Sequence, residues 1–159
     1  MEPYVPSVVS RFWAKVQKTD DCWLWTGKPN PDGYGLLWVS TRMINAHVVS
    51  YQIHVGMVPK GMQVDHTCHV RNCVNPAHLR VVTRKQNQEN RDGVGANNTS
   101  GYRGVSLDKR TGKWRAQVGH EGKMLSAGYY ETPELANEAA IAKRLTLFTH
   151  NELDRHETV

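Results

Sequence analysis

Alternating apolar and polar positions predict a mixture of short helices and short strands in the first half of the chain. Apolar residues at helical spacing predict one helix over residues 6–17 and another over residues 44–55, which Gly56 ends. His47 lies on the second helix, and we expect it to be a satisfied core residue rather than a ligand. Short apolar runs bounded by turn residues predict strands at residues 22–25, 34–39, 62–66 and 79–82.

The pattern is irregular between the last two of these strands and becomes helical after them. Residues 67–77 show no sustained period, which predicts a compact loop. Thr83 and Gln86 have the spacing of a capping box, so a helix is expected over residues 84–92. The order in this part of the chain is therefore strand, loop, strand, helix.

The second half predicts a small sheet followed by a helix. Three apolar and β-branched runs separated by Gly-containing turns predict strands over residues 102–107, 113–119 and 123–130. Thr132 as N-cap and Pro133 as first residue predict the start of a helix with a face of small apolar side chains.

A change of composition separates the two halves. Residues 93–100 are rich in Gly, Asn and Ser and carry no apolar pattern, which is typical of a linker. We therefore expect one domain over residues 1–92, a second over residues 101–151, and a tail over residues 152–159.

Charge narrows the choice of partner. The formal net charge is +5, and ten Lys and Arg stand against four Asp and Glu between Arg80 and Tyr130. This excess favours a polyanion such as DNA, although a solvated basic face would also account for it. No apolar run is long enough to cross a membrane and residues 1–11 lack a signal-peptide pattern. We therefore expect no membrane partner and a soluble, intracellular protein.

Three cysteines are an odd number in a reducing compartment, which argues against a disulfide framework. Cys68, Cys73 and His78 fall close together around the irregular loop, and thiolate and imidazole are preferred zinc ligands. Cys22, at the start of a predicted strand, could complete a tetrahedral set. The alternative is three buried free thiols.

Asp65, His66 and Asn87 are the candidates for catalysis. Asp65 and His66 end one predicted strand, and Asn87 lies on the helix after the returning strand. Carboxylate and amide oxygens suit magnesium, and a neutral imidazole beside them could accept a proton from water. From the residues alone a second interpretation stays open, because adjacent Asp and His are commonly just hydrogen bonded.

The order Asp65-His66, cysteine-containing loop, Asn75-Pro76-Ala77-His78-Leu79 and Asn87 closely resembles the HNH nucleases, especially the His-Cys box homing endonucleases. The resemblance covers roughly residues 22–91. It implies an α+β fold with a zinc-braced ββα-metal nuclease domain whose core motif spans residues 64–90. The implied roles are His66 as general base, Asp65 and Asn87 as ligands of a single catalytic Mg²⁺, Cys22, Cys68, Cys73 and His78 as a structural Zn²⁺ site, and Asn75 as a brace of the loop.

Two positions depart from that family. Many relatives have His-Arg where this chain has His47-Val48, so an arginine that clamps the scissile phosphate must come from elsewhere or be absent. The candidates are Arg71, Arg84 and Arg91. Asn87 stands where a third histidine is usual, which fits magnesium better than a soft transition metal.

The segments Tyr102-Arg103-Gly104-Val105, Gly112-Lys113-Trp114 and Gly128-Tyr129-Tyr130 resemble the Apetala-2/ethylene-response-factor DNA-binding domain. That resemblance implies a small three-stranded antiparallel sheet with one packed helix. A sheet with basic and aromatic side chains can lie in a DNA groove. The expected DNA-binding residues are Arg103, Lys109, Arg110, Lys113, Trp114, Arg115 and Gln117.

These expectations combine into a site-specific, homing-type DNA endonuclease that acts on double-stranded DNA in a bacterial or phage-infected host cytoplasm. A homodimer is one expected assembly, because His-Cys box relatives act as dimers. A monomer is the other, because some phage HNH enzymes act as monomers. The alternative is a DNA-binding regulator whose HNH module has lost catalysis. A zinc-stapled interaction module would leave the basic sheet unexplained.

Overall fold

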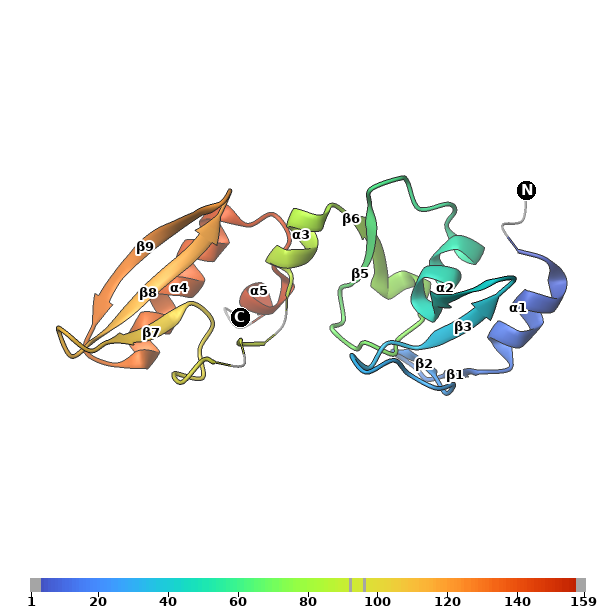
Figure 1. Ribbon diagram of the computed structural model, residues 1–159, viewed down its shortest axis with the longest axis horizontal. Helices are drawn as coiled ribbons and strands as arrows, with labels where there is room; N and C mark the ends of the chain where they lie inside the picture. Colours follow the sequence, from blue (N-terminus) through green and yellow to red (C-terminus); the bar gives the residue numbers. More distant parts are fainter. Residues whose placement is uncertain (1–3, 92, 96, 157–159) are drawn as a thin grey trace. The chain divides into compact units, whose positions relative to one another are not determined.

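The computed structural model describes residues 4–91, 93–95 and 97–156, and the chain divides into two compact units, Met1–Asn87 and Gln88–Val159. Within the described residues, both units combine helices with small antiparallel sheets (Figure 1), which confirms the expected α+β class. None of the helices in this part of the chain is both long and apolar enough to cross a bilayer.

Helix α1 (Pro6–Trp13) opens the first unit and is shorter than the helix predicted over residues 6–17. Residues after it form strand β1 (Val16–Lys18), which pairs antiparallel with β2 (Trp23–Trp25). The prediction of a helix to residue 17 is therefore wrong at its end. Cross-strand pairing of Val16 with Trp25 overrides the local helical period, which carries no information about that partner.

A hairpin of β3 (Leu36–Val39) and β4 (Arg42–Asn45) leads directly into α2 (Ala46–His54). The helix predicted from residue 44 begins two residues later, because Ile44 pairs with Leu37 across the hairpin. The main core of this unit gathers apolar side chains from α1, β2, the hairpin and α2, with Val74 of the long loop. Its buried members are Val8, Phe12, Trp25, Leu37, Val39, Ala46, Val49 and Val74.

The predicted strand, loop, strand, helix order is confirmed. Strand β5 (Gln63–His66) pairs antiparallel with β6 (Leu79–Val82), and the short 3-10 helix η1 (Pro76–His78) ends the loop between them. Helix α3 (Arg84–Glu89) follows. The Thr83 amide donates to Gln86 Oε1 at 2.8 Å and the Gln86 amide to Thr83 Oγ1 at 3.2 Å, which is the predicted capping box. Asp92, the expected last residue of this helix, lies outside the described residues.

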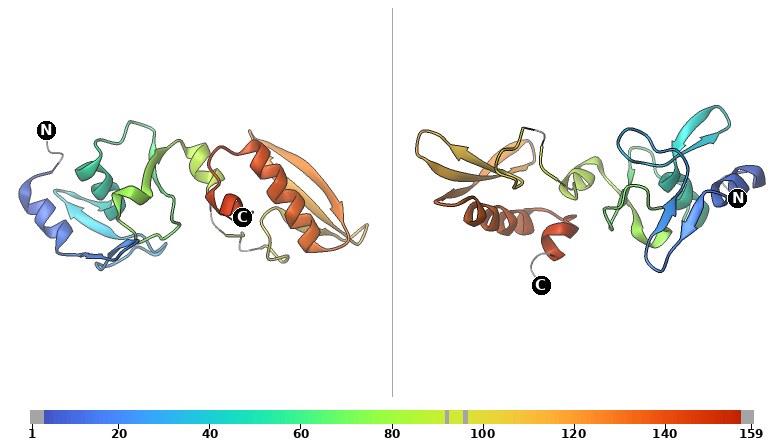
Figure 2. Two further views of the ribbon diagram at one scale, coloured as in Figure 1. Left: turned by 180° about the vertical axis from the view of Figure 1, so that it is seen from behind. Right: turned by 90° about the horizontal axis from the view of Figure 1, so that it is seen from below.

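The second unit has a three-stranded antiparallel sheet, ordered β7 (Val105–Asp108), β8 (Lys113–His120) and β9 (Lys123–Tyr130). Helix α4 (Pro133–Leu147) lies along one face of this sheet (Figure 2). The Thr132 side chain accepts from the Leu135 amide, as the N-cap prediction requires. Small alanines of α4 let the helix approach the sheet closely. A short helix, α5 (Glu152–His156), follows.

The two units meet in sequence within α3, after Asn87, whereas the composition places a linker at residues 93–100. Part of that linker is ordered against the sheet: Asn98 Nδ2 donates to the Tyr102 carbonyl at 2.8 Å, and Ser100 Oγ donates to the Val105 carbonyl at 2.9 Å. Residue 96 of the linker and residues 157–159 of the tail lie outside the described part. The domain boundaries therefore stay a prediction.

Candidate active site and metal cluster

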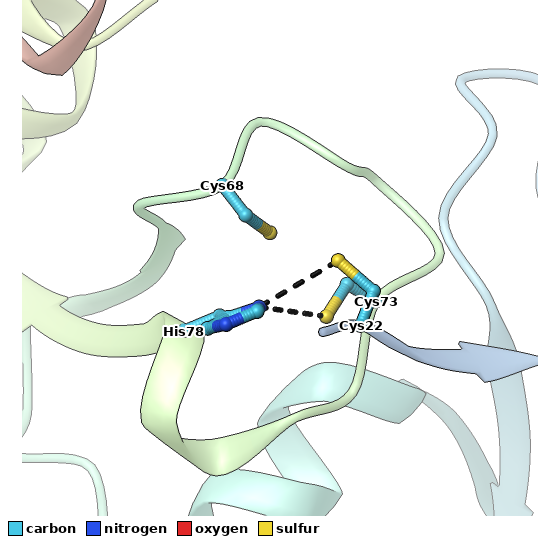
Figure 3. Close-up of side chains that lie close together, drawn as sticks. All are labelled: Cys22, Cys68, Cys73 and His78. Atoms are coloured by element: carbon cyan, nitrogen blue, oxygen red, sulfur yellow. Dashed lines mark hydrogen bonds between the residues drawn. The ribbon is translucent and has the colours of Figure 1, made fainter. Parts of the chain in front are cut away.

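Cys22, Cys68, Cys73 and His78 come together in the first unit, and their ligand atoms all lie within 4.8 Å of one another. Figure 3 shows the three sulfurs and the imidazole pointing toward one another from separate segments of the chain. His78 Nδ1 lies 3.6 Å from both Cys22 Sγ and Cys73 Sγ. A tetrahedral zinc ion with ordinary bond lengths separates sulfur and nitrogen ligands by about 3.6 Å. The donor set and its spacing therefore fit zinc.

The chain holds this cluster through contacts just outside it. Asp21 Oδ1 lies 3.4 Å from His78 Nε2, which leaves Nδ1 of the neutral ring to face the sulfurs. Asn75 Nδ2 donates to the Asp21 carbonyl at 2.7 Å, Asn75 Oδ1 caps η1 by accepting from the Ala77 amide at 3.1 Å, and the Asn75 amide donates to Cys73 Sγ at 3.4 Å. These contacts support the predicted bracing role of Asn75.

The thiols compete for protons in the absence of a cation. A hydrogen bond to Cys73 and burial raise the pKa of the Cys68 thiol, and burial raises the pKa of Cys22. The hydrogen bond with Cys68 lowers the pKa of Cys73. Since a bound metal ion stabilises thiolates, a cation at this cluster would favour ionisation of all three thiols.

A second site lies in a pocket of roughly 340 Å³ in the same unit, at the end of β5. It brings together the three residues that were predicted to be catalytic, and all three come from the β5–β6–α3 arrangement. Asp65 and His66 are 8% and 6% exposed, so both functional groups are largely shielded from bulk water. The pocket is lined by Tyr34, Asn45, His47, Val48, Val58, Met62, Gln63, Val64, Asp65, His66 and Asn87.

The imidazole of His66 is held by the cysteine loop. His66 Nε2 lies 2.9 Å from the Cys73 carbonyl oxygen, which can only accept, so Nε2 carries the proton and the lone pair of the neutral ring is on Nδ1. Burial lowers the pKa of His66, although this hydrogen bond and the charge of Asp65 act in the opposite direction. The ring is therefore neutral near pH 7 and able to act as a base.

Asp65 and Asn87 each have a partner of their own. Asp65 Oδ2 accepts from Arg80 Nε and Nη2, both at 3.2 Å, across the register pair that joins β5 to β6. Asn87 Nδ2 donates to Gln63 Oε1 at 2.8 Å, which fixes the orientation of its amide. One carboxylate and one amide oxygen in one pocket are hard ligands of the kind magnesium prefers.

Arg80 and Asp21, which contact these sites, were not identified from the sequence, and His47 was expected only to be a core residue. Arg80 could have been found from the hairpin register, which places it opposite Asp65. Asp21 directly precedes Cys22, a candidate ligand, but no sequence pattern marks Asp21 itself. Of the arginines considered as phosphate clamps, Arg71 donates to the Asp32 carbonyl at 2.9 Å, and the Arg84 and Arg91 side chains are exposed.

The residues predicted to bind DNA fall into separate groups in the second unit. Ala116 of β8 is buried against α4, and the alternation of a strand places Arg115 and Gln117 on the opposite face. Lys109 and Arg110 lie in the exposed turn between β7 and β8. Lys113 Nζ lies 2.7 Å from Glu131 Oε1. Trp114 packs with the α4 core, which favours a structural role.

Arg103 is also engaged inside its own unit. Its guanidinium donates to the carbonyl oxygens of Gln88, Glu89 and Arg91 at 3.0–3.1 Å and lies 5.6 Å from the centre of the Phe148 ring. Burial lowers its pKa, but it remains charged. This geometry favours a structural role, and DNA contact by Arg103 or Trp114 stays a prediction.

The described residues thus form a candidate metal cluster, a candidate active-site pocket and a sheet with basic side chains. Comparison with family models gives the particular classes: residues 45–89 match the HNH endonuclease family and residues 100–150 match the AP2 domain. The chain thus carries an HNH endonuclease domain followed by an AP2 domain, which confirms the expected HNH and AP2 architecture.

Two relatives come from Escherichia phage T7. Protein 7.7 is 40% identical over 70 residues, which cover 44% of this chain and 54% of the relative. Protein 2.8 is 38% identical over 68 residues, which cover 42% of this chain and 45% of the relative. The chain thus spans about half the length of these relatives. No solved structure matches it significantly.

Proposed function

We propose that the protein is a site-specific, metal-dependent DNA endonuclease of the homing type. The observation that carries this proposal is the buried His66 ring, whose Nε2 is bound to the Cys73 carbonyl, in one pocket with Asp65 and Asn87. This arrangement lies within the segment that matches the HNH endonuclease family. A shielded imidazole beside hard oxygen ligands is suited to hydrolysis of a phosphodiester.

In this mechanism His66 is the general base. Nδ1 takes a proton from the attacking water while the Cys73 carbonyl holds Nε2–H in place. The positive charge that then develops on the ring is stabilised by the neighbouring Asp65 carboxylate, which raises the proton affinity of His66. Asp65 and Asn87 would hold a single Mg²⁺, which when bound stabilises charge on the phosphate and on the leaving oxygen.

We assign the four-residue cluster to a structural zinc ion. Cys22, Cys68, Cys73 and His78 supply four protein ligands, which leaves no open position for substrate and is typical of structural sites. The result is a zinc-braced ββα-metal arrangement of β5, β6 and α3. Cys73 belongs to both sites, because its sulfur is a ligand and its carbonyl binds His66.

The AP2 domain would select the target site. Arg115 and Gln117 lie on the face of the sheet away from α4, where side chains can reach base edges in a groove. Lys109, Arg110 and Lys113 lie at one end of the same sheet and would contact phosphates. A homodimer stays a prediction, which sedimentation of the protein with and without DNA would test.

A supercoiled-plasmid assay tests the proposed reaction. The wild-type protein with Mg²⁺ should convert supercoiled plasmid to nicked or linear forms, and EDTA should abolish this. His66→Ala should lose at least about a hundredfold in rate, as expected when a general base is removed. Intact plasmid with every divalent metal tried would show that the nuclease assignment is wrong.

One observation favours the alternative, a regulator that binds DNA without cutting it. Asp65 Oδ2 already accepts from Arg80, so Arg80 would compete with magnesium for the charge of this carboxylate. The regulator predicts sequence-specific binding with no cleavage, and equal binding by wild type and by Asp65→Ala. Cleavage that depends on both Asp65 and Mg²⁺ would exclude it.

A further inference from the structure

His47 is a buried histidine in the pocket that the proposed reaction does not use. It is 5% exposed and lines the pocket from α2, opposite the end of β5. Its Nδ1 is buried and has no hydrogen-bond partner among the described residues. We expected a core histidine whose nitrogens are hydrogen bonded, and within the described part of the chain Nδ1 of His47 is not. The contacts of His47 with Tyr34 and His66 are made by its ring.

Two rings, those of His47 and Tyr34, pack against the ring of the proposed base His66. The His47 and His66 rings have centroids 4.6 Å apart and are inclined at 60°. The Tyr34 ring lies 5.4 Å from that of His47 and 6.0 Å from that of His66. His66 is thus fixed at Nε2 by the Cys73 carbonyl and over its ring by His47 and Tyr34.

The charge state of His47 is compatible with this packing. Burial, with a smaller effect of His66, lowers the pKa of His47 to about 3. Two neutral imidazoles can pack edge to face, whereas a charged His47 would repel the imidazolium that forms when His66 accepts a proton.

We propose that His47 is a positioning residue for His66, and that it acts through ring contact rather than through its nitrogens. It limits the orientations of the His66 ring so that Nδ1 stays directed at the reacting water. This inference rests on the proposed function. Tyr34, the Cys73 carbonyl and Asp65 also lie near His66, and a substitution at His47 alone does not alter these groups chemically.

Two substitutions separate ring contact from other roles. His47→Phe keeps an aromatic ring at the site and should retain kcat within about threefold, with a folded, zinc-loaded protein. His47→Ala removes the contact and should lower kcat about 10- to 100-fold with KM for DNA unchanged, because small misplacement of a reacting group costs rates of this order. His54→Ala is the matched control, because it also removes an imidazole from α2. The His54 ring contacts the Ser50 carbonyl and packs against Trp13 and Trp23.

A measurement without cleavage tests the same inference. In ¹H–¹⁵N spectra of the histidine side chains, His66 should show one sharp Nε2–H tautomer in wild type and in His47→Phe, and a broadened or mixed signal in His47→Ala. Full kcat together with an unchanged His66 signal in His47→Ala would overturn the proposal, as would a folded His47→Phe protein as slow as His47→Ala. If wild type does not cut plasmid but the spectra behave as expected, the nuclease assignment fails and the positioning of His66 by His47 stands.

Discussion

At the scale of single residues, Cys73 joins the two sites of the first unit, since its sulfur faces the metal cluster and its carbonyl accepts from His66. Loss of the metal should therefore allow the His66 ring, as well as the loop that carries Cys73, to move more freely. In Cys68→Ser a weaker ligand replaces a sulfur that takes no part in the hydrogen bond between His66 and the Cys73 carbonyl. We expect bound zinc to fall well below one ion per chain, with a lower Tm and slower cleavage, measured by elemental analysis, thermal denaturation and the plasmid assay. Full zinc content and unchanged Tm would contradict the zinc assignment.

Asp21 offers a milder test of the same cluster. Its carboxylate lies 3.4 Å from His78 Nε2 and is not a ligand. Asp21→Asn should keep the fold but weaken zinc binding by roughly 10- to 100-fold, because a carboxylate partner orients the ligand and increases its basicity. Competition with a chromogenic chelator measures this. The exposed Asp20→Asn is the control and should leave zinc affinity unchanged.

His47 should make stability depend on pH. Its folded pKa is about 3 against an unfolded value near 6.5, so only the unfolded state takes up a proton as pH falls through this window. Above about pH 6.5, titration of His47 does not change the free energy of unfolding. Below that pH it lowers the free energy of unfolding progressively, by about 2 kcal/mol at pH 5. Urea unfolding of wild type and His47→Phe between pH 7.5 and 5 should show a difference that grows toward low pH. A constant difference would show that His47 is not buried as a neutral ring.

Candidate site residues could be predicted from the sequence where the residue type itself indicates the chemistry, as for the cysteines of the cluster. Cys22 was predicted to join a loop more than forty residues away because thiolate and imidazole are preferred zinc ligands. Arg80 and Asp21 were missed because their importance depends on which atoms they face, and that is set by hairpin register and loop path. His47 was judged by its residue type and helix, which do not reveal the packing against His66.

At the scale of elements, the sequence predicted a helix or strand correctly where the signal lies within the element and does not depend on a distant partner. The capping box of α3, the N-cap of α4 and the strand β9 need no distant partner to be recognised. The end of α1 and the start of α2 were misplaced because the pairs β1–β2 and β3–β4 decide them. Alternation along β8 would have placed Trp114 with Ala116 on the α4 side, but a single strand does not show which face is covered.

Arg103 should act as a tie between elements of the second unit. Its guanidinium satisfies three carbonyl oxygens at and beyond the end of α3, groups that a helix terminus leaves without partners. Arg103→Ala should therefore destabilise the protein by about 2–3 kcal/mol, as for loss of charged hydrogen bonds at a half-buried position. Chemical denaturation measures this. Arg110→Ala, in an exposed turn, should stay within about 0.5 kcal/mol, and equal effects of the two substitutions would contradict this role of Arg103.

At the scale of the whole molecule, the net charge of +5 makes ionic strength a sharp probe of the proposed binding to DNA. Each phosphate contact releases a counterion, so the slope of log K against log salt counts the basic side chains engaged. The full-length double variant Lys109→Ala/Arg110→Ala should weaken binding and reduce the magnitude of that slope by about 1.8. Arg11→Ala/Lys28→Ala removes equal charge from exposed positions of the first unit and should leave the slope unchanged. Fluorescence anisotropy at several salt concentrations measures both, and equal reductions in the two variants would mean that overall charge, rather than the AP2 sheet, determines binding to DNA.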